Sequence, residues 1–431
     1  MSATEPTNTR RCALNLLTAV LRRRQPLDVA FATDPAVLRL PVRDRAFIRN
    51  LTTTTIRRLG QIDNAIDRCL KTPLPKKAEI ARDILRLGAC QLLFLNVADH
   101  AAVDTAVDTA RDIGQGPYAK LINAILRRLG REGAVIVAGQ DAARLNTPDW
   151  LWQAWSEAYG EPQCRAIAEA HMVPADLDIS ARGDPSVWIE PLQASLVGIG
   201  TLRRAAGGDV TQLPGFDDGA WWVQDAAARI VAGLLGDVAG ETVIDLCAAP
   251  GGKTAYLAAA GASVIAVDRS AKRLETVVDN LRRLELSAET IAADGETWKP
   301  DAPVDAVLLD APCSATGTIR RHPDVVHLKS PEDVKNLSAL QGRLLAAAFE
   351  MLKPGGRLVY CTCSLQPEEG SLIVDAFVDA RDDVRLDQIS ADEIGGDASM
   401  IDERGRFRSL PCHLSEHGGI DGFFAARLRR S

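Results

Sequence analysis

The first third of the chain carries apolar residues at helical spacing. Two stripes are clearest, and they consist of Ile80, Ile84, Leu87 and Leu95, and of Leu121, Ile122, Ile125, Leu126 and Leu129. Recurrence every three or four positions places apolar side chains on one face of a helix. Helix breakers separate such stripes, first Pro73 and Pro75 and then Gly114 and Gly116. Residues 1–140 are therefore predicted to form an all-helical bundle.

From about residue 221 the period changes. Short apolar runs at 242–246, 263–267, 304–309 and 357–360 alternate with longer helical stripes. Strand–helix alternation predicts βαβ units and a mainly parallel sheet over residues 221–431. Right-handed crossovers then bring the carboxyl ends of the strands to one rim, where ligands bind in such sheets.

The stretch between these parts, residues 141–220, follows neither period. It opens with Trp150, Trp152 and Trp155, and Pro and Gly interrupt it repeatedly. Tryptophans can stack on nucleobases, but buried packing is the commoner role and is favoured here. The segment is expected to form a small α+β linker subdomain.

Charge separates the same regions. The whole chain has a formal net charge of -7, but residues 1–140 carry 22 basic and 13 acidic side chains. A basic segment on an acidic protein indicates a local contact with nucleic acid, although a solvated basic face explains the charge equally well. No apolar run approaches the length of a membrane span, so no membrane partner is expected.

Nine cysteines in 431 residues are too few for a disulfide scaffold. There is no Cys-x-x-Cys pair, and thiols in a reducing cytosol are expected. The arginine-rich N-terminus could imitate a transit peptide, but Ala13, Leu16, Leu17, Val20 and Leu21 follow helical spacing and fit a first core helix better. A cytoplasmic location is therefore expected.

The first predicted strand runs into Cys247-Ala-Ala-Pro-Gly-Gly-Lys-Thr254. Gly251 and Gly252 let a ligand approach the backbone, and the following helix start offers free N–H groups. This loop matches neither the Walker A nor the G-x-G-x-x-G pattern. Asp268 ends the second strand and Asp294 follows a third, and each could bind ribose hydroxyls or merely cap a helix. Together these features indicate an adenosine-bearing ligand.

Two further turns carry chemistry on the same rim. The strand at 304–309 delivers Asp310-Ala-Pro-Cys-Ser314, and the strand at 357–360 delivers Cys361-Thr-Cys-Ser364. A lone cysteine is usually a small buried apolar residue, but two Cys-Ser pairs after neighbouring strands are harder to dismiss. A metal site is disfavoured because no pair of histidines lies near these cysteines, although His322 and His327 exist.

At this point the sequence resembles a known family. Residues 221–431 are similar to the Sun/Fmu-type (RsmB/Nop2-like) RNA cytosine-C5 methyltransferases. The matching motifs are Cys247-Ala-Ala-Pro-Gly-Gly-Lys-Thr254, Asp310-Ala-Pro-Cys-Ser-Ala-Thr-Gly317, Arg320-Arg-His-Pro-Asp324, Thr362-Cys-Ser364, Pro367-Glu-Glu369 and Asp421-Gly-Phe-Phe424. Residues 1–140 resemble a NusB-like RNA-binding domain through Ala106-Val107 and Leu121-Ile-Asn-Ala-Ile-Leu126. The resemblance implies a Rossmann-like class I methyltransferase domain with a mainly parallel seven-stranded sheet, preceded by an all-α domain and, at 141–220, a small RNA-binding subdomain.

The resemblance also implies residue roles. Cys363 would be the nucleophile, Cys313 would assist release, and Asp310 would hold the cytosine N3 edge. S-adenosyl-L-methionine would bind at Cys247, Ala248, Ala249, Pro250, Gly251, Gly252, Lys253, Asp268, Asp294 and Asp310. Two features depart from the pattern: Gly370 stands where relatives usually carry Asn, and Cys361 adds a thiol before the nucleophile.

The expected partner is RNA, most of all small-subunit (16S) ribosomal RNA, with no DNA partner and a monomeric chain. A tRNA target remains an alternative. An enzyme that methylates an exocyclic amine is disfavoured, because such enzymes place an aromatic residue where Cys313 stands. A non-catalytic RNA-binding factor is the third alternative, and the intact cysteine and cofactor motifs count against it.

Overall fold

The computed structural model describes residues 5–431, which form two compact units. One unit holds the residues up to Val173 together with Arg321–Lys329, and the other holds Pro174–Arg320 and Ser330–Ser431. Residues 140 and 220, the boundaries expected from the sequence, lie within these units, and the three-domain organisation stays a prediction. Among residues 5–431, no helix combines the length and the apolar character that crossing a bilayer requires.

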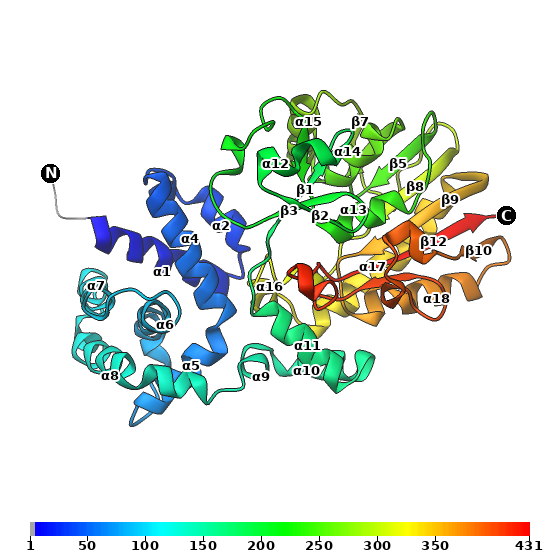
Figure 1. The fold of residues 1–431 in the computed structure, drawn as a ribbon. Coiled ribbons are helices and arrows are strands. Elements are labelled where there is room, and N and C mark those ends of the chain that lie inside the picture. The colour runs from blue at the N-terminus through cyan, green and yellow to red at the C-terminus, as the bar shows by residue number, and fades with distance from the viewer. Residues whose placement is uncertain (1–4) are drawn as a thin grey trace. The chain divides into compact units, whose positions relative to one another are not determined.

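The first unit is all-helical (Figure 1). Its helices are α1 (Glu5–Arg23), α2 (Leu27–Thr33), α3 (Pro35–Leu38), α4 (Val42–Arg57), α5 (Leu59–Cys69), η1 (Lys76–Ala78), α6 (Glu79–Leu93), α7 (Asp99–Asp112), η2 (Gly116–Tyr118), α8 (Ala119–Ala138), α9 (Ala142–Asn146), α10 (Asp149–Tyr159), α11 (Glu161–His171) and α16 (Val325–Leu328). Leu16, Leu17 and Val20 of α1 are buried in the core of this unit, as the helical spacing predicts. The N-terminal stripe is thus a core helix.

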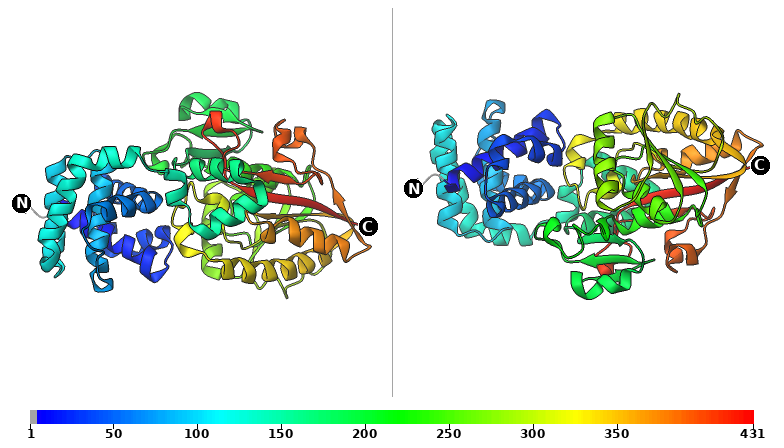
Figure 2. Two further views of the ribbon diagram at one scale, coloured as in Figure 1. Left: turned by 90° about the horizontal axis from the view of Figure 1, so that it is seen from below. Right: turned by 90° about the horizontal axis from the view of Figure 1, so that it is seen from above.

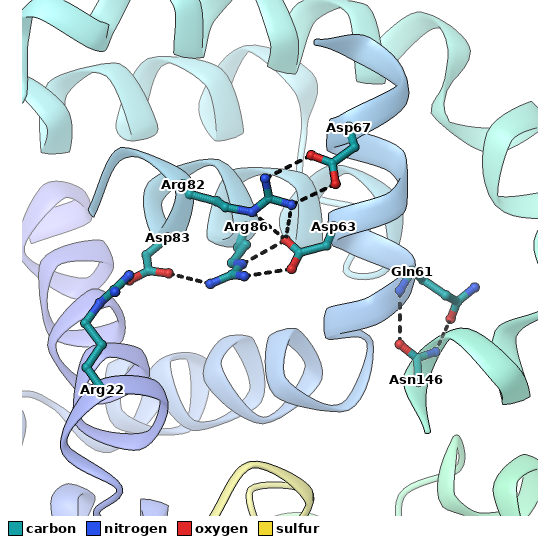
Figure 3. A network of polar contacts seen from close by, with 8 residues as sticks. All are labelled: Arg22, Gln61, Asp63, Asp67, Arg82, Asp83, Arg86 and Asn146. Atoms are coloured by element: carbon teal, nitrogen blue, oxygen red, sulfur yellow. Dashed lines mark hydrogen bonds and ion pairs between the residues drawn. The ribbon is translucent and has the colours of Figure 1, made fainter. Parts of the chain in front are cut away.

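A network of charges joins three of these helices (Figure 3). Asp83 of α6 is fully buried and accepts hydrogen bonds from Arg22 of α1 and Arg86 of α6. Arg86 also reaches Asp63 of α5, at 2.7 Å between Nη2 and Oδ2. Arg82 bridges Asp63 and a second α5 carboxylate one turn along. Several arginines of the basic segment are therefore neutralised inside the unit.

The segment expected at 141–220 begins with helices and continues as strands. Trp155 of α10 is fully buried and its ring lies 5.4 Å from that of His171, in agreement with the packing role expected for the tryptophans. Trp152 is half-buried, with the guanidinium groups of Arg144 and Arg165 over its ring. An antiparallel four-stranded sheet follows in the order β2-β3-β1-β4, formed by β1 (Leu177–Ala181), β2 (Ser195–Val197), β3 (Thr201–Arg204) and β4 (Trp221–Val223).

The larger sheet of the second unit has the order β10-β12-β9-β8-β5-β6-β7, with one further strand paired to β12. Its strands are β5 (Thr242–Leu246), β6 (Ser263–Asp268), β7 (Glu289–Ala292), β8 (Val304–Asp310), β9 (Leu352–Thr362), β10 (Val384–Asp387), β11 (Phe407–Ser409) and β12 (Phe423–Arg430). The pairs from β7 to β9 are all parallel, and those of β12 are antiparallel. In Figure 2 this last strand, in red, runs among the others rather than at an edge. The predicted Rossmann-like, mainly parallel sheet is confirmed.

Helices cover both faces of this sheet (Figure 1). The helices of the second unit are η3 (Pro185–Trp188), α12 (Ile189–Leu192), η4 (Val210–Gln212), α13 (Ala226–Gly233), α14 (Gly252–Ala259), α15 (Ala271–Arg283), η5 (Thr316–Thr318), α17 (Pro331–Glu350), η6 (Pro367–Glu369), α18 (Ser371–Asp379), η7 (Ala391–Ile394), η8 (Ala398–Met400) and η9 (Ser415–His417). Successive strand residues point to opposite faces. Val243 accordingly packs with α13 and α14, whereas Ile244 packs with α17 and α18. Burial on both faces explains why these strands are continuous apolar runs.

Candidate active site

The carboxyl ends of three adjacent parallel strands carry the predicted functional loops. β8 lies between β5 and β9, with Leu246 opposite Leu309 and Asp310 opposite Cys361. The loops that leave β5, β8 and β9 therefore emerge at the same edge of the sheet. This edge is where open parallel sheets bind their ligands.

The loop after β5 makes a turn that requires glycine. Gly251 adopts φ 101°, a left-handed conformation that favours glycine, and a Cβ there would lie 3.1 Å from Cγ1 of Val277. Helix α14 begins at the next residue, Gly252. The loop backbone therefore lies against α15, and the start of α14 faces the same edge of the sheet.

A cavity of about 300 Å³ lies beside this loop. Its lining includes Cys247, Asp268 and Asp294, three residues predicted from the sequence to contact the cofactor. Its remaining lining residues are Leu246, Val267, Arg269, Ser270, Arg273, Ala293, Gly295, Glu296, Pro312, Leu337, Leu340 and Leu344. Leu337, Leu340 and Leu344 belong to α17. Their helical spacing gives no sign in the sequence that this face of the helix borders a cavity.

Asp268 is not the cap of the helix that follows it. The N-cap of α15 is Ser270, whose side chain accepts the N–H of Arg273. Asp268 instead accepts N–H groups from Ala249, at 3.2 Å, and from Ser270, at 2.8 Å. Its carboxylate thus ties the cofactor loop to the end of β6 and borders the cavity.

The lining fits an adenosine-bearing methyl donor. Two carboxylates, Asp268 and Asp294, can accept hydrogen bonds from hydroxyl and amino groups, and the leucines of α17 supply an apolar wall for a flat base. The volume is at the lower limit of pockets that hold such ligands. The residues present therefore suit S-adenosylmethionine.

Two thiols meet at this edge. The Sγ atoms of Cys313 and Cys363 lie 3.4 Å apart, although 50 positions separate them in the sequence. The hydrogen bond to Cys363 and burial raise the pKa of Cys313 well above that of an ordinary thiol. Cys363 is half-buried, whereas Cys361 is fully buried. Cys361 lies within β9, and of these two cysteines only Cys363 is partly exposed.

A partly buried ion pair lies beside the thiols. Nζ of Lys253 and Oδ2 of Asp310 are 2.7 Å apart, and the two side chains are 11% and 31% exposed. Burial of Lys253 works against its charge, but the Asp310 carboxylate prevails and raises the pKa of Lys253. The other oxygen of Asp310 lies 3.6 Å from the sulfur of Cys361. Lys253 is thus a permanent cation between the cofactor loop and the cysteines.

The chain matches two family models and a set of related proteins. The model of a family described as 16S rRNA methyltransferase RsmB/F matches residues 232–429, and that of the NusB family matches residues 7–131. A ribosomal RNA small subunit methyltransferase B from Cronobacter sakazakii is 35% identical over 98% of both chains. The chain belongs to this methyltransferase family. It is an S-adenosylmethionine-dependent RNA methyltransferase with a NusB domain at its N-terminus.

Solved structures share its fold. The crystal structure of PH0851 superposes with a TM-score of 0.75 at 22% identity and covers the whole of both chains. A methyltransferase homolog protein from Pyrococcus horikoshii superposes with a TM-score of 0.54 at 28% identity, and covers 65% of this chain and 94% of its own. The fold expected from the motifs is therefore shared with solved structures, and the family resemblance is confirmed by the relative from Cronobacter sakazakii.

This methyltransferase has a buried acid that sequence reasoning missed. Asp245 of β5 is fully buried and accepts a hydrogen bond from Thr254 at 2.6 Å. Burial raises the pKa of Asp245 to about 7, against the lowering effect of that hydrogen bond and of Lys253. A carboxylate inside the apolar run Thr242-Val-Ile-Asp-Leu was the available signal.

Arg408 supports the loop next to the departure at Gly370. Its Nη1 donates to the Ser364 carbonyl at 2.6 Å, and its guanidinium lies over the ring of Phe424. A Cβ at residue 370 would come within 2.9 Å of both Arg408 and Phe424. Glycine therefore makes room for an arginine that holds the Cys363 loop from another strand, β11.

The histidines weighed as metal ligands lie elsewhere. His322 and His327 belong to the segment Arg321–Lys329 of the helical unit, where Nδ1 of His322 is 3.2 Å from an oxygen of Asp28. Burial lowers the pKa of His327 to about 4. Within residues 5–431 no group of three or more His, Cys, Asp or Glu is arranged to hold a metal ion.

Proposed function

We propose that this methyltransferase acts on carbon 5 of a cytosine in 16S ribosomal RNA, through a covalent bond between Cys363 and carbon 6 of the base. The observation that carries the proposal is the 3.4 Å separation of the Cys313 and Cys363 sulfurs beside the cofactor cavity. The names of the relatives, ribosomal RNA small subunit methyltransferase B, support the choice of RNA.

Carbon 5 of cytosine is a poor nucleophile. Addition of the Cys363 thiolate to carbon 6 makes the ring electron-rich at carbon 5, which divides one hard step into easier ones. S-adenosylmethionine supplies the methyl group when it is bound. The thiolate is the reactive form of a cysteine, and Lys253 places a positive charge within electrostatic reach of Cys363.

Asp310 is the residue proposed to hold the base. One of its oxygens is occupied by Lys253, and the carboxylate remains 31% exposed at the edge of the sheet. A carboxylate there accepts a hydrogen bond from the N3 edge once the ring is protonated, which stabilises the ring while the thiolate adds. The ion pair with Lys253 holds this carboxylate in place.

Cys313 is proposed to complete the reaction. As a thiolate it takes the proton from carbon 5, the electrons of that C–H bond restore the ring double bond, and the C6–S bond breaks to return the Cys363 thiolate. In the free protein the pKa of Cys313 is raised, mainly by its hydrogen bond to Cys363 and also by burial. Once Cys363 is bonded to carbon it no longer carries the charge that opposes this ionisation, so Cys313 loses its proton more easily.

Variants of the two cysteines test these roles. Cys363→Ala should abolish incorporation of labelled methyl groups from S-adenosylmethionine into 16S RNA. Cys313→Ala should instead accumulate a covalent protein–RNA species that migrates slowly on a denaturing gel. Adduct in Cys363→Ala and none in Cys313→Ala would reverse the assignment. Nuclease digestion should release 5-methylcytidine, and N4-methylcytidine would contradict the proposal.

A further inference from the structure

A single buried carboxylate connects the loops of the two cysteines. Glu369 is fully buried and comes from η6, just after the Cys363 loop. The residues that follow the cysteines, Ser314 and Ser364, both bond to it. The steps proposed for Cys363, Asp310 and Cys313 do not use this carboxylate.

All four acceptor positions of the Glu369 carboxylate are used. Oε1 accepts the backbone N–H of Ser314 at 2.8 Å and Nε2 of Gln341 at 3.1 Å. Oε2 accepts the hydroxyl of Ser364 at 2.5 Å and also that of Ser314. A buried carboxylate needs such donors, because an unsatisfied charge in the interior is costly.

The backbone of Glu369 is held from the sheet. Its carbonyl accepts the Tyr360 hydroxyl at 2.8 Å and the Thr362 hydroxyl at 3.0 Å, and both donors belong to β9. Gln341 of α17 also donates to the Pro312 carbonyl at 2.8 Å. Glu369 is therefore held in place by β9 and α17, the strand and the helix that flank the site.

We propose that Glu369 is a positioning residue that keeps the Cys313 and Cys363 thiols in register, so that Cys313 can act on the adduct formed by Cys363. This rests on the proposed function. Each serine that Glu369 binds is one residue from a reacting sulfur, so a shift of either loop passes directly to the thiol. Misplacement of reacting groups by about 1 Å can lower a rate by about 10²-fold.

A second contact limits how far the loops can separate. The N–H of Gly317 donates to the Cys363 carbonyl at 3.0 Å, and a Cβ on Gly317 would collide with the Gly422 carbonyl. This backbone contact remains when Glu369 is replaced. Loss of the carboxylate should therefore loosen the two thiols without unfolding the loops.

Two substitutions separate position from charge. In Glu369→Gln the amide oxygen can accept from Ser314 N–H and Gln341, while the amide NH₂ donates to the two serine hydroxyls, which can turn to accept. Glu369→Ala removes all four bonds. Glutamine should therefore retain most of the alignment, and alanine should lose it.

Cross-linking measures the alignment without any reaction on RNA. Diamide takes two electrons and two protons from two adjacent thiols and leaves a disulfide. Wild type and Glu369→Gln should form the Cys313–Cys363 disulfide at similar rates, and Glu369→Ala about tenfold more slowly. Mass spectrometry locates the disulfide. Equal rates in Glu369→Ala and wild type would overturn the proposal.

The consequence for catalysis is a trapped intermediate. Glu369→Ala should lower turnover and accumulate the covalent RNA adduct, and the further change Cys363→Ala should abolish it. If Glu369→Ala cross-links slowly but accumulates no RNA adduct, although Cys313→Ala does accumulate one, the proposal is also overturned. If Cys313→Ala traps none, the proposed function fails, and the cross-linking rate alone decides the role of Glu369.

Asp83→Ala is the control for destabilisation: it should cross-link at the wild-type rate.

Discussion

Three ionisable groups lie at one edge of an apolar sheet, and they are Asp245, Lys253 and Asp310. The Asp310 carboxylate keeps Lys253 charged despite its burial, whereas Asp245 has only the hydroxyl of Thr254 as a direct partner. The second oxygen of Asp245 has no hydrogen-bond partner among the described residues. Burial therefore favours the neutral acid at Asp245, and the ion pair carries the charge of the site.

The free energy of unfolding should depend on pH through the titration of Asp245. The pKa of this carboxyl rises from its ordinary 3.8 to about 7 on folding, so the folded chain binds the proton more tightly. The resulting stabilisation is present below about pH 4 and is lost as the pH rises to about 7, by roughly 4 kcal/mol. Burial of His327 gives an opposite trend over the same range in both proteins, so the test is the difference in unfolding free energy between wild type and Asp245→Asn, which should fall by this amount across that range in urea unfolding.

The matched control is another acid on a neighbouring strand. Bonds from Lys353 and the Thr242 N–H lower the pKa of Asp305, so its own contribution is lost only in acid. Asp305→Asn should leave the slope between pH 5 and pH 8 unchanged. A difference between wild type and Asp245→Asn that does not change with pH would contradict the assignment of the titration to Asp245.

Helices α1 and α6, which apolar spacing predicted, are joined to each other and to α5 by charges that the spacing does not reveal. A stripe predicts a helix because the period of 3.6 is local information. The pairing of Arg22 with Asp83 is not local, because 61 positions separate the two residues. The composition suggests that these arginines are available to RNA, whereas in the folded unit they pair with carboxylates (Figure 3).

Replacing Asp83 should destabilise the helical unit. Asp83→Ala leaves Arg22 and Arg86 without their buried partner, which should cost about 3–5 kcal/mol of unfolding free energy. Glu79→Ala removes only an exposed partner of Arg22 and should cost less than about 1 kcal/mol. Denaturant unfolding of both variants checks the difference, and equal costs would mean that the network adds little to stability.

For the molecule as a whole, the remaining basic residues decide where RNA can bind. On α8, Lys120, Arg127 and Arg131 are exposed at spacings of seven and four, which places them on one helix face. No described carboxylate pairs with any of the three, whereas the neighbouring Arg128 pairs with Glu132. This face is the place where phosphate contacts are expected.

Salt should therefore weaken RNA binding steeply. The double variant Lys120→Glu/Arg131→Glu should lower affinity and reduce the slope of log K against log salt concentration by about 1–2, because two phosphate contacts are lost. Turnover at saturating RNA should change little. Lys335→Glu/Arg385→Glu changes the net charge equally on the other unit and should leave the slope unaltered. Equal effects of both variants would indicate a non-local charge effect.

The sequence alone determined the local and ordered properties of this protein. Apolar period predicted the helices and strands, and motif order identified the family, since both depend on neighbours along the chain. The 3.4 Å contact of Cys313 with Cys363, the raised pKa of Asp245 and the four bonds of Glu369 were decided only by the tertiary structure. Distances and local dielectric depend on which distant segments pack together, and spacing along one chain does not contain that information.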